Sequence, residues 1–404
     1  MRVLLFPSAY LPALGGVEEL TRHLALELTR SGDEVEVWTG RMPSSELLAV
    51  EQLDGLTVRR FLVELPALDA GALLRFPPIA YRTLAEMRRV VSRWRPDLVH
   101  VQCFGPNGAY ALALAEMTRT PLVVTLQGET LMDNDDIYDH SVVLRTALRA
   151  GIARAAAVTG CSQFTLDDAV RRFGLAPGRG QVIFNGVGEL SSAVVDGDRS
   201  ADSFAASVLG ISPGRRYVFA VGRVVEKKGF DLLLDAFVRV AAAHPDTDVV
   251  VGGEGPALPA LRSRALSLGL SDRVAFPGRL ARDDVGRAMA GAAVFVMPSR
   301  LEPFGIVALE GWRAGVPVVA TARGGASEFV RDGEDGLLVD PFDPVAFAKA
   351  LDTLLGNGDL ARRMGAAGRL RVAEFSWPSI ASRYRRVYEE VARSSGGRGA
   401  SSGT

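Results

Sequence analysis

The sequence has few of the residues that cross-link or anchor other classes of protein. It holds two cysteines in 404 residues, which cannot staple a fold of this size, and they do not form a metal-ligand cluster. We therefore expect a reduced, cytosolic protein. Long apolar runs are also missing. There is no stretch of about 18 apolar residues, and the apolar start breaks at Pro7, so neither a spanning helix nor a signal peptide is expected.

Neither sign of charge is in excess. The chain carries 46 basic and 47 acidic side chains, for a formal net charge of -1, so no global field favours nucleic acid. Hydrophobic residues make up 48% and charged residues 23%, as is usual for a globular chain with a large core. A mainly disordered protein is thereby excluded.

Short apolar segments alternate with amphipathic ones along the chain. A strand is predicted at 3–7, then a turn at Gly15 and Gly16, an amphipathic helix ending at Gly32, and a strand at 34–38. This βαβ order is typical of a doubly wound parallel sheet. A second alternation starts near residue 215. The sequence therefore predicts an α/β protein of two Rossmann-like domains facing a cleft.

Composition marks the expected boundaries. The first domain is expected over 1–190, a linker rich in serine, aspartate and glycine over 191–214, and the second domain over 215–376. The serine- and glycine-rich tail at 395–404 is expected to be disordered.

Two cations follow the first strand of the second half. Arg223 and Lys228 lie between that strand and a helix, whose N-terminus itself favours anions. A guanidinium with an ammonium suits a diphosphate that gains charge as it leaves. A solvated basic loop is the alternative.

Two acids follow a later strand. Glu302 is expected in the loop at that strand's end, and Gly305 opens a helix whose second turn carries Glu310. Carboxylates accept hydrogen bonds from hydroxyl pairs, which suits a ribose and a sugar ring. In the alternative, Glu310 decorates a helix surface. The pair Gly324 and Gly325, after the next strand, allows backbone amides to approach an anion closely.

Taken together, these residues resemble the retaining, nucleotide-sugar-dependent glycosyltransferases of family 4 (glycosyltransferase group 1, the phosphatidylinositol mannosyltransferase type), which have the GT-B fold. The likeness runs from Met1 to about Arg393. The matching marks are Gly222-Arg223, Lys228-Gly229, Gly253-Glu254-Gly255-Pro256, Phe276-Pro277-Gly278, Pro298-Ser299, Glu302-Pro303-Phe304-Gly305, Glu310, Gly324-Gly325, Gly15-Gly16-Val17-Glu18 and Asn185-Gly186-Val187.

The resemblance implies a role for each matched residue. Arg223 and Lys228 would hold the donor diphosphate and Glu302 the donor sugar, as the catalytic set. The second domain would bind the nucleotide sugar and the first the acceptor, with the helix at 377–394 packing back on the first domain. The remaining donor contacts would be Gly16 over the phosphates, the backbone from Gly278 to Leu280 at the nucleobase, Phe304 and Gly305 beside the sugar, and Glu310 at the ribose.

One position departs from the family pattern. After the strand at 121–126, many relatives have a histidine near the reacting sugar, whereas this chain has Gln127 and, two residues on, Glu129. Glutamine can hydrogen-bond a hydroxyl but cannot relay a proton. We therefore expect the leaving phosphate oxygen to take the acceptor proton, with Glu129 as a second candidate base on the acceptor side.

Two weaker patterns have ordinary alternatives. The acidic run from Asp133 to Asp136 could clamp a metal, but a solvated loop or an acceptor contact is favoured, because Arg223 and Lys228 already supply positive charge. Basic amphipathic helices around 81–95 and 145–154 could rest on the inner face of a membrane if the acceptor is a lipid. A solvated helix face is favoured.

The sequence thus predicts a hexosyltransferase that works without a metal or other cofactor. It would move a sugar from a nucleoside diphosphate, UDP or GDP, to a hydroxyl of a glycan, lipid or small molecule, with retained configuration. A non-catalytic sugar-nucleotide-binding subunit and an epimerase on the same fold are the alternatives. A dinucleotide dehydrogenase is disfavoured, because no Gly-x-Gly-x-x-Gly follows the first strand.

Overall fold

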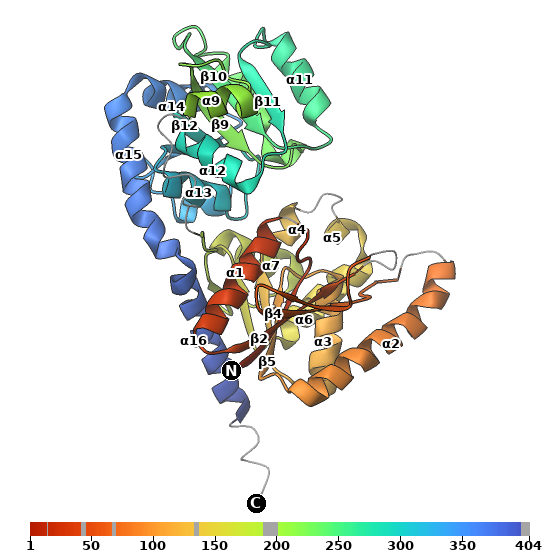
Figure 1. The fold of residues 1–404 in the computed structure, drawn as a ribbon. Coiled ribbons are helices and arrows are strands. Elements are labelled where there is room, and N and C mark those ends of the chain that lie inside the picture. The colour runs from red at the N-terminus through yellow and green to blue at the C-terminus, as the bar shows by residue number, and fades with distance from the viewer. Residues whose placement is uncertain (14, 42–45, 67–69, 133–136, 189–200, 397–404) are drawn as a thin grey trace, which may run out of the picture. The chain divides into compact units, whose positions relative to one another are not determined.

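The chain folds into two units, each built on a parallel sheet. Unit 1 is formed by Met1–Gly186 with the segment from Trp377 onward, and unit 2 by Val187–Ser376. The predicted α/β class with two Rossmann-like sheets is confirmed. The computed structural model describes residues 1–13, 15–41, 46–66, 70–132, 137–188 and 201–396 (Figure 1).

Unit 1 contains an eight-stranded sheet within the described residues, in the order β3-β4-β2-β1-β5-β6-β7-β8. Neighbouring strands run parallel except β3, which pairs antiparallel with β4. Strand β3, which is short and has exposed and half-buried side chains, was not predicted. The strands are β1 (Arg2–Pro7), β2 (Glu34–Gly40), β3 (Val50–Leu53), β4 (Leu56–Phe61), β5 (Leu98–Gln102), β6 (Leu122–Leu126), β7 (Ala157–Gly160) and β8 (Gly180–Val182).

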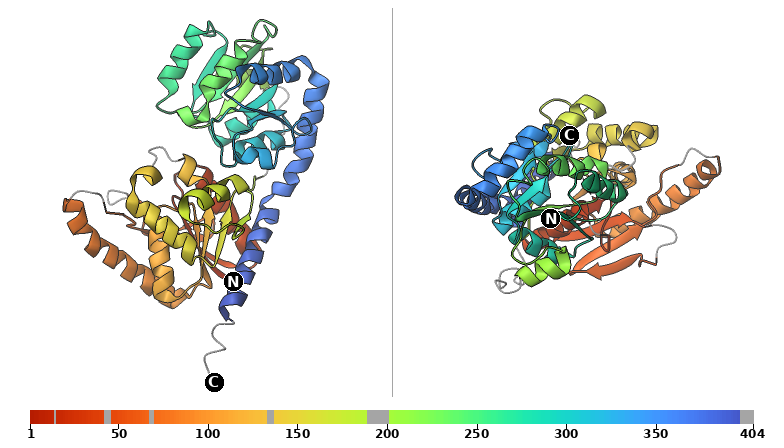
Figure 2. Two further views of the ribbon diagram at one scale, coloured as in Figure 1. Left: turned by 180° about the vertical axis from the view of Figure 1, so that it is seen from behind. Right: turned by 90° about the horizontal axis from the view of Figure 1, so that it is seen from above.

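Helices cover both faces of this sheet. On one face α1 packs beside α16, and Leu24, Trp377 and Tyr388 share a core with the inward side chains of the strands. Helices α2, α3, α6 and α7 contribute to the core of the opposite face (Figures 1 and 2). The helices are α1 (Gly16–Arg30), α2 (Ala70–Trp94), α3 (Pro106–Thr118), α4 (Glu129–Met132), α5 (Ile137–His140), α6 (Val142–Arg154), α7 (Gln163–Phe173) and α16 (Trp377–Gly396).

Unit 2 contains a six-stranded sheet within the described residues, in the order β11-β10-β9-β12-β13-β14. All neighbouring strands are parallel, so their carboxyl ends meet at one edge. The strands are β9 (Arg216–Val221), β10 (Thr247–Gly252), β11 (Val274–Gly278), β12 (Val294–Met297), β13 (Val318–Thr321) and β14 (Leu337–Val339).

Short helices and turns connect these strands. Helices α10, α11 and α14 form a core on one face of the sheet, with Phe237 and Phe347 fully buried. The elements are η2 (Glu226–Lys228), α10 (Phe230–Phe237), α11 (Leu258–Ser267), α12 (Arg282–Ala290), α13 (Ile306–Ala314), η3 (Gly325–Glu328), α14 (Pro344–Gly356), α15 (Gly358–Arg371) and η4 (Val372–Phe375).

Two segments expected to be irregular are partly helical. Within the expected linker, α9 (Ala201–Phe204) and η1 (Ala205–Leu209) form because Phe204 and Leu209 are buried in unit 2. Residues 191–200 of that linker lie outside the described residues. In the expected tail, α16 continues to Gly396, and the rest of the tail lies outside the described residues. In the part of the chain that the structure describes, no helix is long and apolar enough to cross a membrane.

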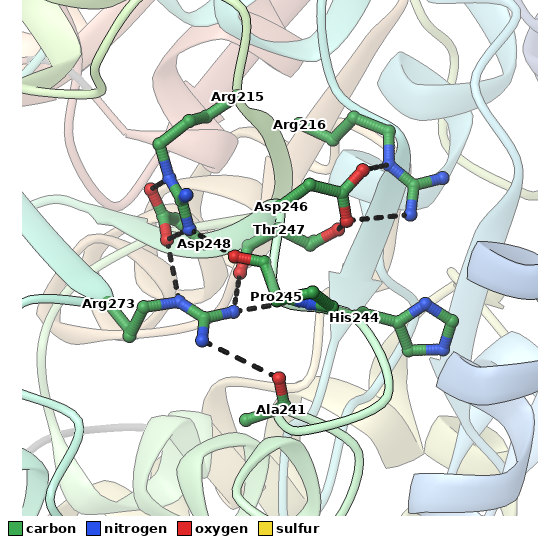
Figure 3. A network of polar contacts seen from close by, with 9 residues as sticks. All are labelled: Arg215, Arg216, Ala241, His244, Pro245, Asp246, Thr247, Asp248 and Arg273. Carbon is green, nitrogen blue, oxygen red and sulfur yellow. Dashed lines mark hydrogen bonds and ion pairs between the residues drawn. The ribbon is translucent and has the colours of Figure 1, made fainter.

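A network of ion pairs fixes the amino edge of the unit 2 sheet. Asp248 is 5% exposed and lies between Arg215 and Arg273 (Figure 3), with N–O distances of 2.6 and 2.9 Å. Because Asp248 pairs with Tyr217 at the start of β9, this network lies at the amino end of the parallel strands. It therefore stabilises the sheet at its amino edge and does not form part of the opposite, carboxyl edge.

Candidate functional site

The two predicted cations follow β9 as expected. Arg223 is exposed, and Lys228 ends the 3-10 turn η2 directly before α10. Gly229 has a φ of +65°, and a Cβ there would lie 2.1 Å from the carbonyl oxygen of Pro298. Glycine therefore lets the backbone after Lys228 approach the end of β12 closely.

This approach brings Lys228 to the first predicted acid. Lys228 Nζ lies 2.7 Å from Glu302 Oε2, and Ser299 Oγ donates to the same oxygen at 2.7 Å. Glu302 is 7% exposed. A carboxylate so far out of water is stabilised by a cation and a hydroxyl together. We name Lys228, Ser299 and Glu302 the Lys–Ser–Glu cluster.

The backbone of Glu302 is held by the loop after β13. Its N–H donates to the carbonyl of Arg323 at 3.0 Å, and its carbonyl accepts from the N–H of Gly325 at 2.8 Å. Gly324, with a φ of +127°, sits where a Cβ would lie 2.0 Å from the Glu302 carbonyl oxygen. The predicted glycine pair thus packs on the backbone of the acid in this structure.

The second acid lies on the helix predicted for it. Gly305, with a φ of +101°, precedes α13, and Glu310 is half-buried in its second turn. Burial lowers the pKa of Arg313, and the charge of Glu310 opposes this shift. The side chain of Phe304 is 3% exposed and packs against Phe329, with ring centroids 4.9 Å apart. Only its backbone is therefore suited to a ligand.

The predicted nucleobase segment follows β11. Gly278 ends that strand with a φ of +78°, and its carbonyl accepts from the N–H of Gly253 at 2.7 Å. The side chain of Leu280 lies against the backbone of Gly252, the last residue of β10. This segment therefore lies at the same sheet edge as the loops after β9 and β12.

Unit 1 carries the other predicted residues. Gly16 is the first residue of α1, and Gln127 follows β6. Glu129 accepts two backbone hydrogen bonds, from the N–H of Phe104 at 2.7 Å and from that of Gln127 at 2.6 Å. These bonds tie the loop after β5 to the loop after β6.

Burial raises the pKa of Glu129 to about 7, and the charge of Asp168 acts in the same direction. The backbone donors at Phe104 and Gln127 oppose the shift, because they favour the carboxylate. Glu129 thus links two loops by hydrogen bonds, and its pKa is suited to proton exchange near neutral pH.

Ser299 was not predicted as a member of the site. Its only signal was membership of the Pro298-Ser299 mark, whereas its role follows from the hydrogen bond to Glu302. In the residues that the structure describes, no group of three or more His, Cys, Asp or Glu side chains could hold a metal ion. The acidic run 133–136 lies outside those residues.

The arrangement in unit 2 suits an anionic ligand with hydroxyl groups. Parallel strands bring the loops after β9, β11, β12 and β13 to one edge of the sheet, where ligands of open α/β sheets bind. The ammonium of Lys228 has three donors, of which the carboxylate of Glu302 takes one. The remaining donors can serve a phosphate while Glu302 stays paired.

Comparisons with known proteins cover nearly the whole chain. Residues 203–371 match the family model "Glycosyl transferases group 1", and residues 14–188 match "Glycosyltransferase Family 4". Relatives named D-inositol 3-phosphate glycosyltransferase come from Salinispora arenicola and Streptomyces scabiei. They are 31% and 30% identical over 93% of this chain, and 87% and 86% of their own lengths are covered.

Solved structures share the fold at lower identity. Sucrose-phosphate synthase from Thermosynechococcus elongatus has a TM-score of 0.78 and 22% identity, with 97% of this chain and 99% of that chain covered. Anabaena HepE, solved in complex with UDP and glucose, has a TM-score of 0.76 and 20% identity, with 96% and 100% covered.

Proposed function

Because the chain belongs to the glycosyltransferases of group 1 and family 4, with the GT-B fold, we infer that it transfers a hexosyl group from a nucleoside diphosphate sugar to a hydroxyl, with retained configuration. The observation that carries this proposal is the Lys–Ser–Glu cluster. It joins a cation and a buried acid from the loops after β9 and β12, at the carboxyl edge of one sheet.

The residues of unit 2 divide the donor between them. Lys228 and Arg223 hold the diphosphate, and their charge stabilises the phosphate as the sugar leaves. Glu302 accepts hydrogen bonds from the sugar hydroxyls, and the ion pair with Lys228 holds its carboxylate in place for that role. Glu310 takes the ribose hydroxyls, while the backbone at Phe304 and Gly305 lies beside the sugar. The segment from Gly278 to Leu280 contacts the base.

The transfer step needs no side chain of the protein as a base. The acceptor oxygen forms the new bond to the anomeric carbon on the face from which the phosphate leaves. The bond between that carbon and the phosphate oxygen breaks, and the acceptor proton passes to the same oxygen. Gln127 supports this scheme, since its amide can position a hydroxyl but cannot take the proton. Glu129 is occupied by two backbone donors and serves mainly to fix the loops.

Names of relatives guide the choice of donor and acceptor. We favour UDP as the nucleotide, because HepE was solved with UDP and with UDP-glucose. Inositol 3-phosphate is the first acceptor to test, because relatives at about 30% identity are named for it. Independence from a metal, a cytosolic location and peripheral membrane contact through the basic helices stay predictions.

The proposal is tested in two stages. A thermal-shift panel of nucleoside diphosphate sugars identifies the donor, since a ligand at 100 times its dissociation constant stabilises by about 2.7 kcal/mol. The best donor is then incubated with the acceptor panel, and proton NMR gives the anomeric configuration of the product. We expect a retained product. Binding without turnover would instead indicate a non-catalytic subunit, and donor isomerisation without an acceptor would indicate an epimerase.

A further inference from the structure

A chain of side-chain hydrogen bonds begins at Gln127, where β6 ends. Gln127 Nε2 donates to Gln102 Oε1 at 3.0 Å, and Gln127 Oε1 accepts from Asn185 Nδ2 at 3.0 Å. Gln102 is fully buried and Asn185 is 5% exposed, whereas Gln127 is partly exposed. The amide of Gln127 is therefore held on both sides. One N–H and one carbonyl lone pair are left to a ligand.

These hydrogen bonds continue along one face of β5 to the last helix. Gln102 Nε2 lies 3.3 Å from His100 Nε2, and His100 Nδ1 lies 2.6 Å from the hydroxyl of Tyr388 on α16. His100 and Tyr388 are both fully buried. A polar path thus connects α16, on one face of the unit 1 sheet, with the acceptor-side loop after β6.

We assign the direction of these hydrogen bonds from the orientation of the Gln102 amide. Burial lowers the pKa of His100 to about 3, so the ring is neutral and has one donor and one acceptor nitrogen. Because the carbonyl of Gln102 already accepts from Gln127, its amide nitrogen donates to His100 Nε2. The proton of His100 therefore sits on Nδ1 and is donated to Tyr388.

The hydroxyl of Thr125 is compatible with this direction. It lies 2.7 Å from His100 Nε2 and 2.5 Å from Thr159 Oγ1, so with Nε2 unprotonated it donates to His100 and accepts from Thr159. A buried network of this kind is costly unless every member is satisfied, and a core of apolar side chains would pack as well. Its directionality therefore points to a task beyond packing.

We propose that Tyr388 is a positioning residue, which acts through His100 and Gln102 to fix the orientation of the Gln127 amide toward the acceptor hydroxyl. This inference rests on the proposed transfer reaction. Without the Tyr388 hydroxyl, the imidazole proton has no partner at Nδ1 and can move to Nε2. A proton on Nε2 then faces the N–H of the Gln102 amide. That amide turns over, and the Gln127 amide must turn over in response. Gln127 would then present its carbonyl where the acceptor hydroxyl meets an N–H in the wild type, and its N–H where the hydroxyl meets the carbonyl.

Asn185 holds the Gln127 amide on the side opposite Gln102. Its own Oδ1 is buried and accepts no hydrogen bond from the residues that the structure describes. The partly exposed amide of Gln127 is therefore the group of this pair that is open to a hydroxylated ligand.

The test compares Tyr388→Phe with Tyr110→Phe. Tyr110 is buried in the same unit, and its hydroxyl donates to the backbone of Glu64 at 2.9 Å, outside this network. We expect Tyr388→Phe to lower kcat by about 10- to 100-fold, the scale of a small misplacement at the reacting centre. The shift in Tm caused by the donor, which unit 2 binds, should be unchanged. Tyr110→Phe should keep kcat within about threefold of the wild type.

Selective ¹⁵N-histidine labelling gives a second readout, because the chain has four histidines. We expect the His100 proton on Nδ1 in the wild type and on Nε2 in Tyr388→Phe. A wild-type proton on Nε2 would overturn the inference. If the wild type showed no transfer at all, the proposed function would fail, while this labelling would still decide the positioning claim.

Rescue separates positioning from a loss of packing. Gln102→Glu introduces a carboxylate that accepts both from Gln127 and from a His100 proton on Nε2. The double variant Gln102→Glu/Tyr388→Phe should therefore recover part of the kcat that Tyr388→Phe loses. Additive losses in this cycle, or equal losses in Tyr388→Phe and Tyr110→Phe, would contradict the inference.

Discussion

Lys228 and Glu302 are 74 residues apart in the sequence, yet Lys228 Nζ lies 2.7 Å from Glu302 Oε2. The pair joins the loop after β9 to the loop after β12, and Ser299 completes it. In the proposed reaction, each partner holds the other in place while it contacts a different part of the donor.

Glu302→Gln and Lys228→Ala should each lower the rate of transfer by at least about 10²-fold, because Lys228→Ala removes a positive charge from the departing phosphate and Glu302→Gln removes the carboxylate that accepts from the sugar hydroxyls. Ser299→Ala should cost less, about tenfold, since Lys228 still pairs with Glu302. Donor turnover measures the rate, and circular dichroism verifies the fold. Full activity in either charged-residue variant would refute the role assigned to it.

The backbone contact between Gly324 and Glu302 gives a prediction on stability. Gly324→Ala should lower the free energy of unfolding by about 3 kcal/mol, because its Cβ would meet the Glu302 carbonyl oxygen at a φ of +127°. Urea unfolding measures this change. Gly333→Ala is the matched control. Gly333 has a φ of +80° with nothing within 4 Å, so about 1 kcal/mol is expected. Equal losses would show that the close contact is unimportant.

The Asp248 network should affect stability and spare transfer. Asp248→Ala leaves Arg215 and Arg273 without their buried carboxylate and should cost about 3 kcal/mol, the lower end for a broken buried ion pair. The exposed pair of Asp246 with Arg216 provides the control, and Asp246→Ala should cost less than about 1 kcal/mol. Unfolding is again the measurement, and the kcat of folded Asp248→Ala should match the wild type.

Glu129 should give the unfolding free energy a defined pH dependence. Its pKa is about 7 in the folded state and near 4.5 when unfolded, so between these values the folded state binds the extra proton. Its contribution is therefore full below about pH 4.5 and is lost as the pH rises toward 7. His100 acts in the opposite direction, because its pKa is lowered on folding. The difference between wild type and Glu129→Gln isolates the Glu129 contribution, and a pH-independent difference would contradict this assignment.

The sequence was sufficient to predict the elements that place the site. The strand before Arg223, the loop position of Glu302 and the helix carrying Glu310 were predicted from apolar runs and glycine, which encode local structure directly. The short strand β3 was missed, because its alternating pattern covers four residues and includes no fully buried side chain. The linker assignment was partly wrong because Phe204 and Leu209 gain their helix from burial in unit 2, a tertiary effect.

Pairings between distant residues could not be predicted. The ion pair of Lys228 with Glu302 depends on Gly229 packing against Pro298, a backbone contact that no local pattern specifies. His100 is a second example. Its partner Tyr388 lies 288 residues away, and the residue types alone gave no reason to join them. Such contacts follow from the strand order, which a single sequence leaves open.

A structure of the chain with the nucleoside diphosphate sugar that gives the largest thermal shift tests the central claim most directly. We predict that the diphosphate lies within hydrogen-bond reach of Lys228 and Arg223, with a sugar hydroxyl on Glu302. A nucleotide bound away from the carboxyl edge of the unit 2 sheet would contradict the account.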